Sequence, residues 1–179
     1  MALPATVYRV AIELSDVDRN YYSHLATTVA RHPSETAERM VARLIAYSLC
    51  HNEQITFTKG VSDGDEPDLW IKSLDGQLIN WIEVGLPEAK RLVKAGKHCE
   101  QVILFAYGSG FDRWLAGSRK QLVSMKNFRL FYLSDELLSF LVAQLNRSIV
   151  WQFTCSDKTL YITSGTESIV SELNEIAVR

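Results

Sequence analysis

The chain has 179 residues, of which 47% are hydrophobic and 22% charged, which is enough to bury the core of one globular domain spanning residues 1–179. The formal net charge of −2 gives no global argument for a nucleic-acid partner. No apolar run has the length of a membrane span and the N-terminus lacks a signal peptide's continuous hydrophobic stretch, so we expect a cytoplasmic protein with no membrane contact.

The N-terminal residues predict a β-hairpin followed by a helix. Residues 6–31 alternate polar and apolar side chains on both sides of the polar turn SDVDRN, which indicates two antiparallel strands. Residues 35–50 then repeat apolar side chains at helical spacing. Ser34 is the expected N-cap of this helix, with the acidic Glu35 in its first turn. The helix leads through HNEQ into a loop rich in glycine and aspartate.

A second hairpin is predicted over residues 68–85. The segments DLWIK and LINWIEVG have strand character, and the turn SLDGQ between them contains Asp75-Gly76, a strong hairpin signal. Asp68 lies seven residues before Asp75, and Glu83 lies seven residues after Gly76. Because antiparallel arms pair symmetrically about their turn, we predict that the two acids are cross-strand neighbours.

The rest of the chain alternates helices with strands. This order implies parallel neighbouring strands, so the predicted fold class is α/β, with a central mixed β-sheet flanked by helices. The predicted elements are a helix from Pro87, a strand at 101–107, a helix at 112–125, a strand at 128–133, a helix at 134–146 and strands within 148–164, while the tail at 167–179 fits strand or helix equally well.

Cysteine and histidine spacing gives no sign of a zinc site or a disulfide framework. The three cysteines are odd in number, lie far apart and form no CxxC pair, so we expect small buried residues. The four histidines show no metal-ligand spacing.

Two facing carboxylates need a compensating charge. Like charges opposite each other destabilise a sheet and raise the pKa of one carboxyl unless a cation lies between them. Mg²⁺ or Mn²⁺ suits oxygen ligands from neighbouring strands, so Asp68 and Glu83 are the predicted metal ligands. The alternative is that Asp68 caps a loop and Glu83 is exposed at a sheet edge.

The segments GDEPDLWIK, NWIEVGLPEAKRLVKAGKH and VILFAYG resemble the bacterial YaeQ family, and the resemblance covers nearly the whole chain. It implies a variant of the PD-(D/E)xK nuclease fold. In such enzymes two acids hold the metal, and a lysine two residues after the second acid activates water. Pro67-Asp68 matches the first half of this pattern and Glu83 begins the second, but Gly85 stands where the lysine is expected.

A substitute for that lysine is expected on the helix after Pro87. Lys94 is the favoured catalytic cation, and Lys90 and Arg91 are the alternates. Lys94 lies about 10 Å along the helix from Pro87, which sets it beside the preceding strand. The other interpretation is a solvated helix face.

Two further residues are candidates for the site. Glu38 shares a helical stripe with Val41 and Ile45, so it is expected to lean toward the core boundary, whereas Glu35 can pair with Arg39. The four tryptophans have core-like patterns, but Trp81 shares a strand face with Glu83 and is placed to stack on a base or to close the site.

The predicted activity is metal-dependent hydrolysis of nucleic-acid phosphodiesters. Residues 86–130 hold nine basic and three acidic side chains, a local excess that permits a phosphate-binding face but is also common on solvated helices. The alternative, favoured by Gly85, is an inactive module of the same fold that binds nucleic acid or a protein partner. The sequence does not distinguish DNA from RNA.

Overall fold

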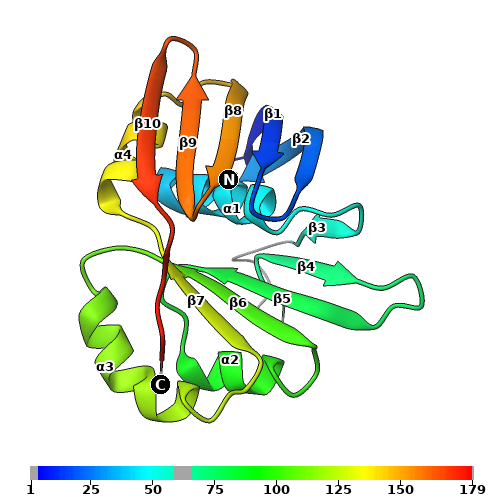
Figure 1. Ribbon diagram of the computed structural model, residues 1–179, viewed down its shortest axis with the longest axis vertical. Coiled ribbons are helices and arrows are strands. Elements are labelled where there is room, and N and C mark those ends of the chain that lie inside the picture. Colours follow the sequence, from blue (N-terminus) through cyan, green and yellow to red (C-terminus); the bar gives the residue numbers. More distant parts are fainter. Residues whose placement is uncertain (1–3, 59–65, 179) are drawn as a thin grey trace. The chain divides into compact units, whose positions relative to one another are not determined.

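The computed structural model describes residues 4–58 and 66–178, which form two compact units (Figure 1). The first unit contains residues 4–49 and 134–173, and the second contains the described residues of 50–133 together with 174–178. Most of the predicted loop rich in glycine and aspartate lies outside the described residues. No helix in the described ranges is both long enough and apolar enough to cross a membrane.

The first unit is a five-stranded sheet with the order β10-β9-β8-β1-β2. β1 pairs antiparallel with β2, as predicted for the N-terminal hairpin, and parallel with β8. Buried side chains alternate along β1 and β8, and the helices α1 and α4 pack against each other. The elements are β1 (Thr6–Asp16), β2 (Tyr21–Arg31), α1 (Ala37–Leu49), α4 (Asp135–Ala143), β8 (Ser148–Ser156), β9 (Thr159–Ser164) and β10 (Glu167–Glu172).

The start of α1 differs from the prediction. Thr36, not Ser34, caps the helix, because its Oγ1 accepts a hydrogen bond from the Arg39 backbone N–H at 3.2 Å. The Ser34 hydroxyl instead lies 2.7 Å from Nδ1 of His32, and it holds the preceding turn. The prediction of Ser34 as N-cap was therefore wrong by two residues.

The burial of the two acids at the start of α1 also differs from the prediction. Glu35 is buried and forms an ion pair with Arg43 at 2.9 Å, instead of pairing with Arg39. Glu38 is exposed, so the expectation that it leans toward the core boundary was wrong. α1 starts at Ala37, so Glu35 precedes the helix by two positions, and its side chain turns inward to meet Arg43.

The second unit is a six-stranded sheet with the order β11-β7-β6-β5-β4-β3. β5, β6 and β7 run parallel, and α2 and α3 connect them, as the alternating order predicted. Leu92 of α2 packs with Leu104 and Leu130 of the sheet. The elements are β3 (Ile55–Phe57), β4 (Leu69–Lys72), β5 (Leu78–Val84), α2 (Ala89–Ala95), β6 (Gln101–Ala106), α3 (Phe111–Leu122), β7 (Phe128–Tyr132) and β11 (Asn174–Glu175).

The fold is mixed α/β with two mixed sheets, where a single central sheet was expected. The prediction of a single sheet was wrong because β1 pairs in parallel with β8, which follows α4 in the chain. The N-terminal hairpin therefore belongs to a different sheet from β5–β7. The ambiguous tail forms strands β10 and β11. Two short strands, β3 and β11, were not predicted separately.

The hairpin of β4 and β5 has the predicted register. Leu69 pairs with Ile82, Trp70 with Trp81 and Ile71 with Asn80, all symmetric about Asp75-Gly76. The turn closes through the hydrogen bond from the Ser73 backbone N–H to the Gln77 carbonyl at 2.9 Å. Gly76 has φ +86°, a conformation that favours glycine.

Gly76→Ala is expected to destabilise the second unit by about 1 kcal/mol, because alanine is strained at a positive φ. The added Cβ would have no atom within 4 Å, so neither a clash nor new packing contributes to the effect. Gly117→Ala is the matched control, because Gly117 lies in α3 and its added Cβ also meets nothing within 4 Å. It should stabilise the protein by about 0.5–1 kcal/mol. Urea unfolding midpoints measure both effects. Equal shifts for the two variants would contradict a strained turn.

Candidate functional site

Asp68 lies just before β4 and is 1% exposed. Its backbone N–H donates to the Ile82 carbonyl at 3.1 Å, and its Oδ2 accepts a hydrogen bond from the Val84 backbone N–H at 2.8 Å. The carboxylate therefore satisfies a buried donor at the end of β5. Its location beside the returning strand agrees with the predicted pairing.

Glu83 lies on β5 and is 4% exposed. Its Oε1 accepts hydrogen bonds from Trp81 Nε1 at 2.8 Å and from Arg91 Nε at 2.6 Å. Trp81 and Glu83 point to the same side of the strand because they are two residues apart. One oxygen of the buried Glu83 carboxylate thus accepts hydrogen bonds from both an indole and a guanidinium. The alternative that Glu83 is exposed at a sheet edge was therefore wrong.

The pKa of Glu83 reports this environment. Burial raises the pKa above its usual value of 4.5, and the nearby Asp68 carboxylate adds to the rise. The Arg91 cation and the Trp81 hydrogen bond lower the pKa, but they do not cancel the effect of burial. The two acids, which the hairpin register places close together, are thus near enough for the charge of Asp68 to raise the pKa of Glu83.

The third position of the sequence pattern, Gly85, has a structural reason to be glycine. Its φ is +90° and its backbone N–H donates to the Phe105 carbonyl at 2.9 Å, so the chain turns sharply here while still pairing with β6. A lysine at this position would adopt a strained conformation. The cation must come from another element.

That cation is Arg91 of α2, an alternate in the sequence prediction. Besides Glu83, its Nη2 donates to the Glu66 carbonyl. α2 runs back along β5, so residues farther along the helix face residues farther back on the strand. Arg91 therefore faces Glu83, while the favoured Lys94, one turn later, faces the level of Trp81. The helix begins at Ala89 and not at Pro87, which shifts this match.

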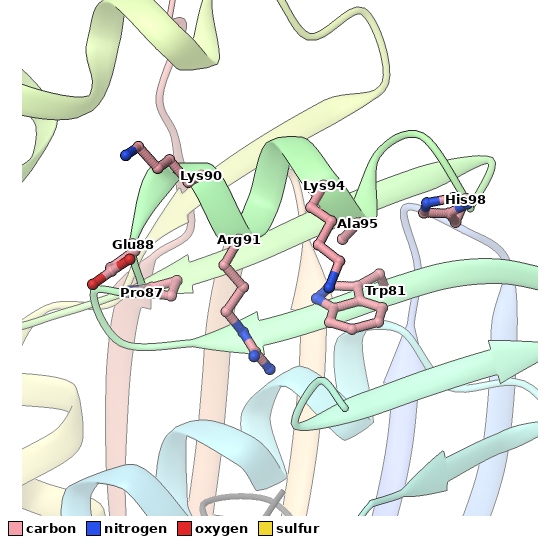
Figure 2. A pocket seen from close by; sticks show the side chains of 8 residues that line it. All are labelled: Trp81, Pro87, Glu88, Lys90, Arg91, Lys94, Ala95 and His98. Carbon is pink, nitrogen blue, oxygen red and sulfur yellow. The ribbon is translucent and has the colours of Figure 1, made fainter. Parts of the chain in front are cut away.

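A cavity of about 660 Å³ opens beside this cluster (Figure 2). Figure 2 shows Arg91 and Lys94 extending from α2 toward the strand that carries Trp81. Lys90 and Lys94 are exposed, whereas Arg91 is half-buried. The lining residues are Trp81, Pro87, Glu88, Lys90, Arg91, Lys94, Ala95 and His98, so basic side chains outnumber the one acid.

A smaller hollow of about 260 Å³ lies on the other side of the two lysines. Lys97, Val93, Gln121 and Ser124 complete its lining together with Lys90 and Lys94. The exposed lysines of α2 thus border two adjoining hollows. The arrangement is suited to an extended anion with more than one charge.

The loop between β5 and α2 is held in place by a tryptophan of α3. Trp114 of α3 donates its Nε1–H to the Pro87 carbonyl at 2.7 Å, and its ring packs near Phe111. This contact was not predicted, because nothing in the spacing of Trp114 and Pro87 marks them as partners. It fixes the start of α2 and hence the level of Arg91.

The residues present match a divalent ion in chemistry but not in arrangement. Asp68 and Glu83 supply the oxygen ligands that Mg²⁺ or Mn²⁺ prefers. However, Arg91 already occupies the charged side of Glu83, and no group of three or more His, Cys, Asp or Glu residues suited to a metal occurs in the part of the chain that the structure describes. Glu38 belongs to the first unit and is exposed.

The cysteines and histidines add no second reactive centre in the described residues. Cys155 is buried, and burial together with Asp16 and Asp18 raises the pKa of its thiol to about 12. Such a thiol is a poor nucleophile at neutral pH. Cys50 and Cys99 form no disulfide and are only half-buried, so the expectation of buried cysteines holds for Cys155 alone.

Comparison with known proteins finds one family. A family model described as "YaeQ protein" matches residues 1–173. "Uncharacterized protein YaeQ" of Escherichia coli (strain K12) is 35% identical over 170 residues, with 94% of each chain covered. The protein of the same name from Salmonella typhi is 35% identical over 174 residues, which cover 97% of this chain and 96% of that relative.

Two solved structures have the same fold over almost the whole chain. The crystal structure of YaeQ protein from Pseudomonas syringae matches with a TM-score of 0.94 at 38% identity, and 98% of each chain is covered. That of YaeQ protein from Xanthomonas axonopodis pv. citri matches with a TM-score of 0.90 at 30% identity, covering 96% of this chain and 97% of that one.

Glu83→Gln should gain stability over the wild type as the pH rises. Because the folded-state pKa of Glu83 is raised, the stability that this group contributes is fully present below about pH 4.5 and is lost as the pH rises through the raised pKa. The amide does not ionise, and its oxygen can still accept both hydrogen bonds. Urea unfolding between about pH 4 and about pH 8 measures the difference.

The exposed Glu53→Gln is the matched control for the loss of one carboxylate. A stability difference between Glu83→Gln and the wild type that stays constant over this pH range would contradict a buried, costly charge at Glu83.

Proposed function

Since the chain belongs to the YaeQ family, we propose its function from its own site: the second unit is a PD-(D/E)xK nuclease-type module that binds the phosphates of nucleic acid without cutting them. The nuclease-type core is supported by the placement of the acids. Asp68 after Pro67 and Glu83 on the next strand belong to a mixed sheet with crossover helices. This is the arrangement that the sequence resemblance implied.

The observation that carries the proposal is the ion pair between Arg91 and Glu83, with Nε and Oε1 2.6 Å apart. In a metal-dependent nuclease the second acid must be available to the ion. Here the Arg91 guanidinium supplies the compensating charge. The pair holds Arg91 at the wall of the cavity, where its side chain is still 28% exposed.

Phosphate is the ligand chemistry that the cavity favours. Exposed lysines and a planar guanidinium bind phosphate oxygens through charge-assisted hydrogen bonds. Lys90 and Lys94 border a second hollow as well, so a ligand with successive phosphates can contact both. The local basic excess of residues 86–130 also favours a polyanionic ligand.

Metal-dependent hydrolysis is the second candidate. It is favoured by the raised pKa of Glu83, to which burial and the neighbouring Asp68 carboxylate both contribute, because such an environment favours a gain of positive charge. In this reading Arg91 would leave Glu83 when Mg²⁺ or Mn²⁺ and nucleic acid arrive.

Lys94→Met is expected to weaken oligonucleotide binding in EDTA and to reduce the slope of log K against log salt by about 0.7–0.9, the loss of one phosphate contact. Lys126→Met is the matched control, since Lys126 is exposed in the same basic segment but does not line either cavity. Fluorescence anisotropy over a salt series measures both. Equal slopes for the two variants would place the phosphates elsewhere.

The wild-type protein should not cut plasmid, single-stranded DNA or RNA when Mg²⁺ or Mn²⁺ is added, because Arg91 retains Glu83. Asp68→Asn and Glu83→Gln are assayed in parallel by gel electrophoresis. Cleavage by the wild type that both substitutions abolish would establish the second candidate. Cleavage that survives both would come from a contaminant.

A further inference from the structure

We infer that the sheet face beside the cavity binds unpaired bases on Trp70 and Trp81, so the ligand of this site is single-stranded nucleic acid. The inference rests on the proposed phosphate binding at α2 and adds the class of ligand. Nothing in the sequence pattern of Trp70 marks it as different from a core residue.

The register places the two indoles next to each other on one face. Trp70 of β4 lies directly opposite Trp81 of β5. Side chains of directly paired residues project to the same side, and their Cβ atoms are about 4.5–5.5 Å apart. Trp81 shares this side with Glu83 and lines the cavity. Trp70 therefore lies on the strand next to the cavity-lining Trp81, on the same face of the sheet.

Both indoles are only half-buried, as is Trp114, but neither is held in the protein core. Trp151 is 1% exposed in the core of the first unit, and Trp114 is engaged with Pro87. The strand next to Trp70 is β3, where the paired residue is the small, exposed Thr56. No large side chain from that position covers the Trp70 ring.

Cations lie against both rings. Lys72 Nζ is 3.5 Å from the centroid of the Trp70 ring, and Arg91 Cζ is 5.5 Å from that of Trp81. The Trp70 face is therefore covered by a flexible, half-exposed lysine side chain at this point. Lys72 itself is half-exposed, which lets its flexible side chain move aside.

Aromatic rings flanked by cationic side chains are typical of sites that bind single-stranded nucleic acid. Bases stack on the rings irrespective of sequence, and the cations contact the phosphates that join them. In this arrangement a base replaces the Lys72 ammonium over Trp70, and the ammonium moves to a phosphate. Lys94 and Arg91 contact the next phosphates at the cavity. A duplex keeps its bases stacked internally and offers them no such access.

The test compares three fluorescein-labelled probes of equal length by anisotropy: a mixed-sequence single strand, an abasic single strand and a blunt duplex. DNA and RNA single strands form separate arms. The wild type should bind the intact strand more tightly than the abasic strand or the duplex. Trp70→Leu should weaken binding of the intact strand about 5- to 100-fold and leave the abasic strand unchanged. Trp70→Phe, which keeps an aromatic face, should retain most of the affinity.

A second readout does not depend on a folded variant. Intact strands should quench the tryptophan fluorescence of the wild type, and abasic strands should not. Equal binding of intact and abasic strands, or tighter binding of the duplex, would overturn base stacking while leaving phosphate binding in place. Failure of all three probes to bind would overturn the proposed function and this inference together.

Discussion

The burial of the Glu83 carboxylate is the constraint on which the second unit depends. An ionised acid with a side chain 5% exposed is stable only if donors and a cation reach it. Trp81 and Arg91 meet this need, and each is thereby fixed in place. Arg91 connects α2 to β5, and through the Glu66 carbonyl it also connects α2 to the segment that leads into Asp68. The carboxylate thus acts as a positioning residue for the cationic wall of the cavity.

The conformation of Gly85 bears on which element supplies the cation beside Glu83. The positive φ of Gly85 disfavours a lysine at that position. The cation beside Glu83 comes instead from α2, whose start is held by Trp114. A helix-borne cation reaches the acid from the side of the cavity, not from along the strand. Arg91 therefore neutralises the buried acid and also lines the cavity.

Local patterns predicted the parts of the structure that depend on neighbours in sequence. The symmetry of residues about Asp75-Gly76 predicted the hairpin register, and the alternation after Pro87 predicted the parallel strands β5, β6 and β7. The predictions that failed concerned either pairing between segments far apart in the sequence or the residue at which a helix begins. The pairing of β1 with β8 joins segments that local periodicity cannot relate. The choice of Arg91 over Lys94 depended on where α2 starts, which propensity alone leaves uncertain by a residue or two.

The short outer strands of the second unit have a consequence for association between molecules. The sheet ends in β3 and β11, which are three and two residues long. Each covers part of its longer neighbour, and β11 is further held by the ion pair between Arg129 and Glu175 at 2.7 Å. A two- or three-residue strand offers few unpaired backbone groups to a foreign strand. This sheet is therefore a poor template for strand-by-strand aggregation, although its interior strands are rich in apolar side chains.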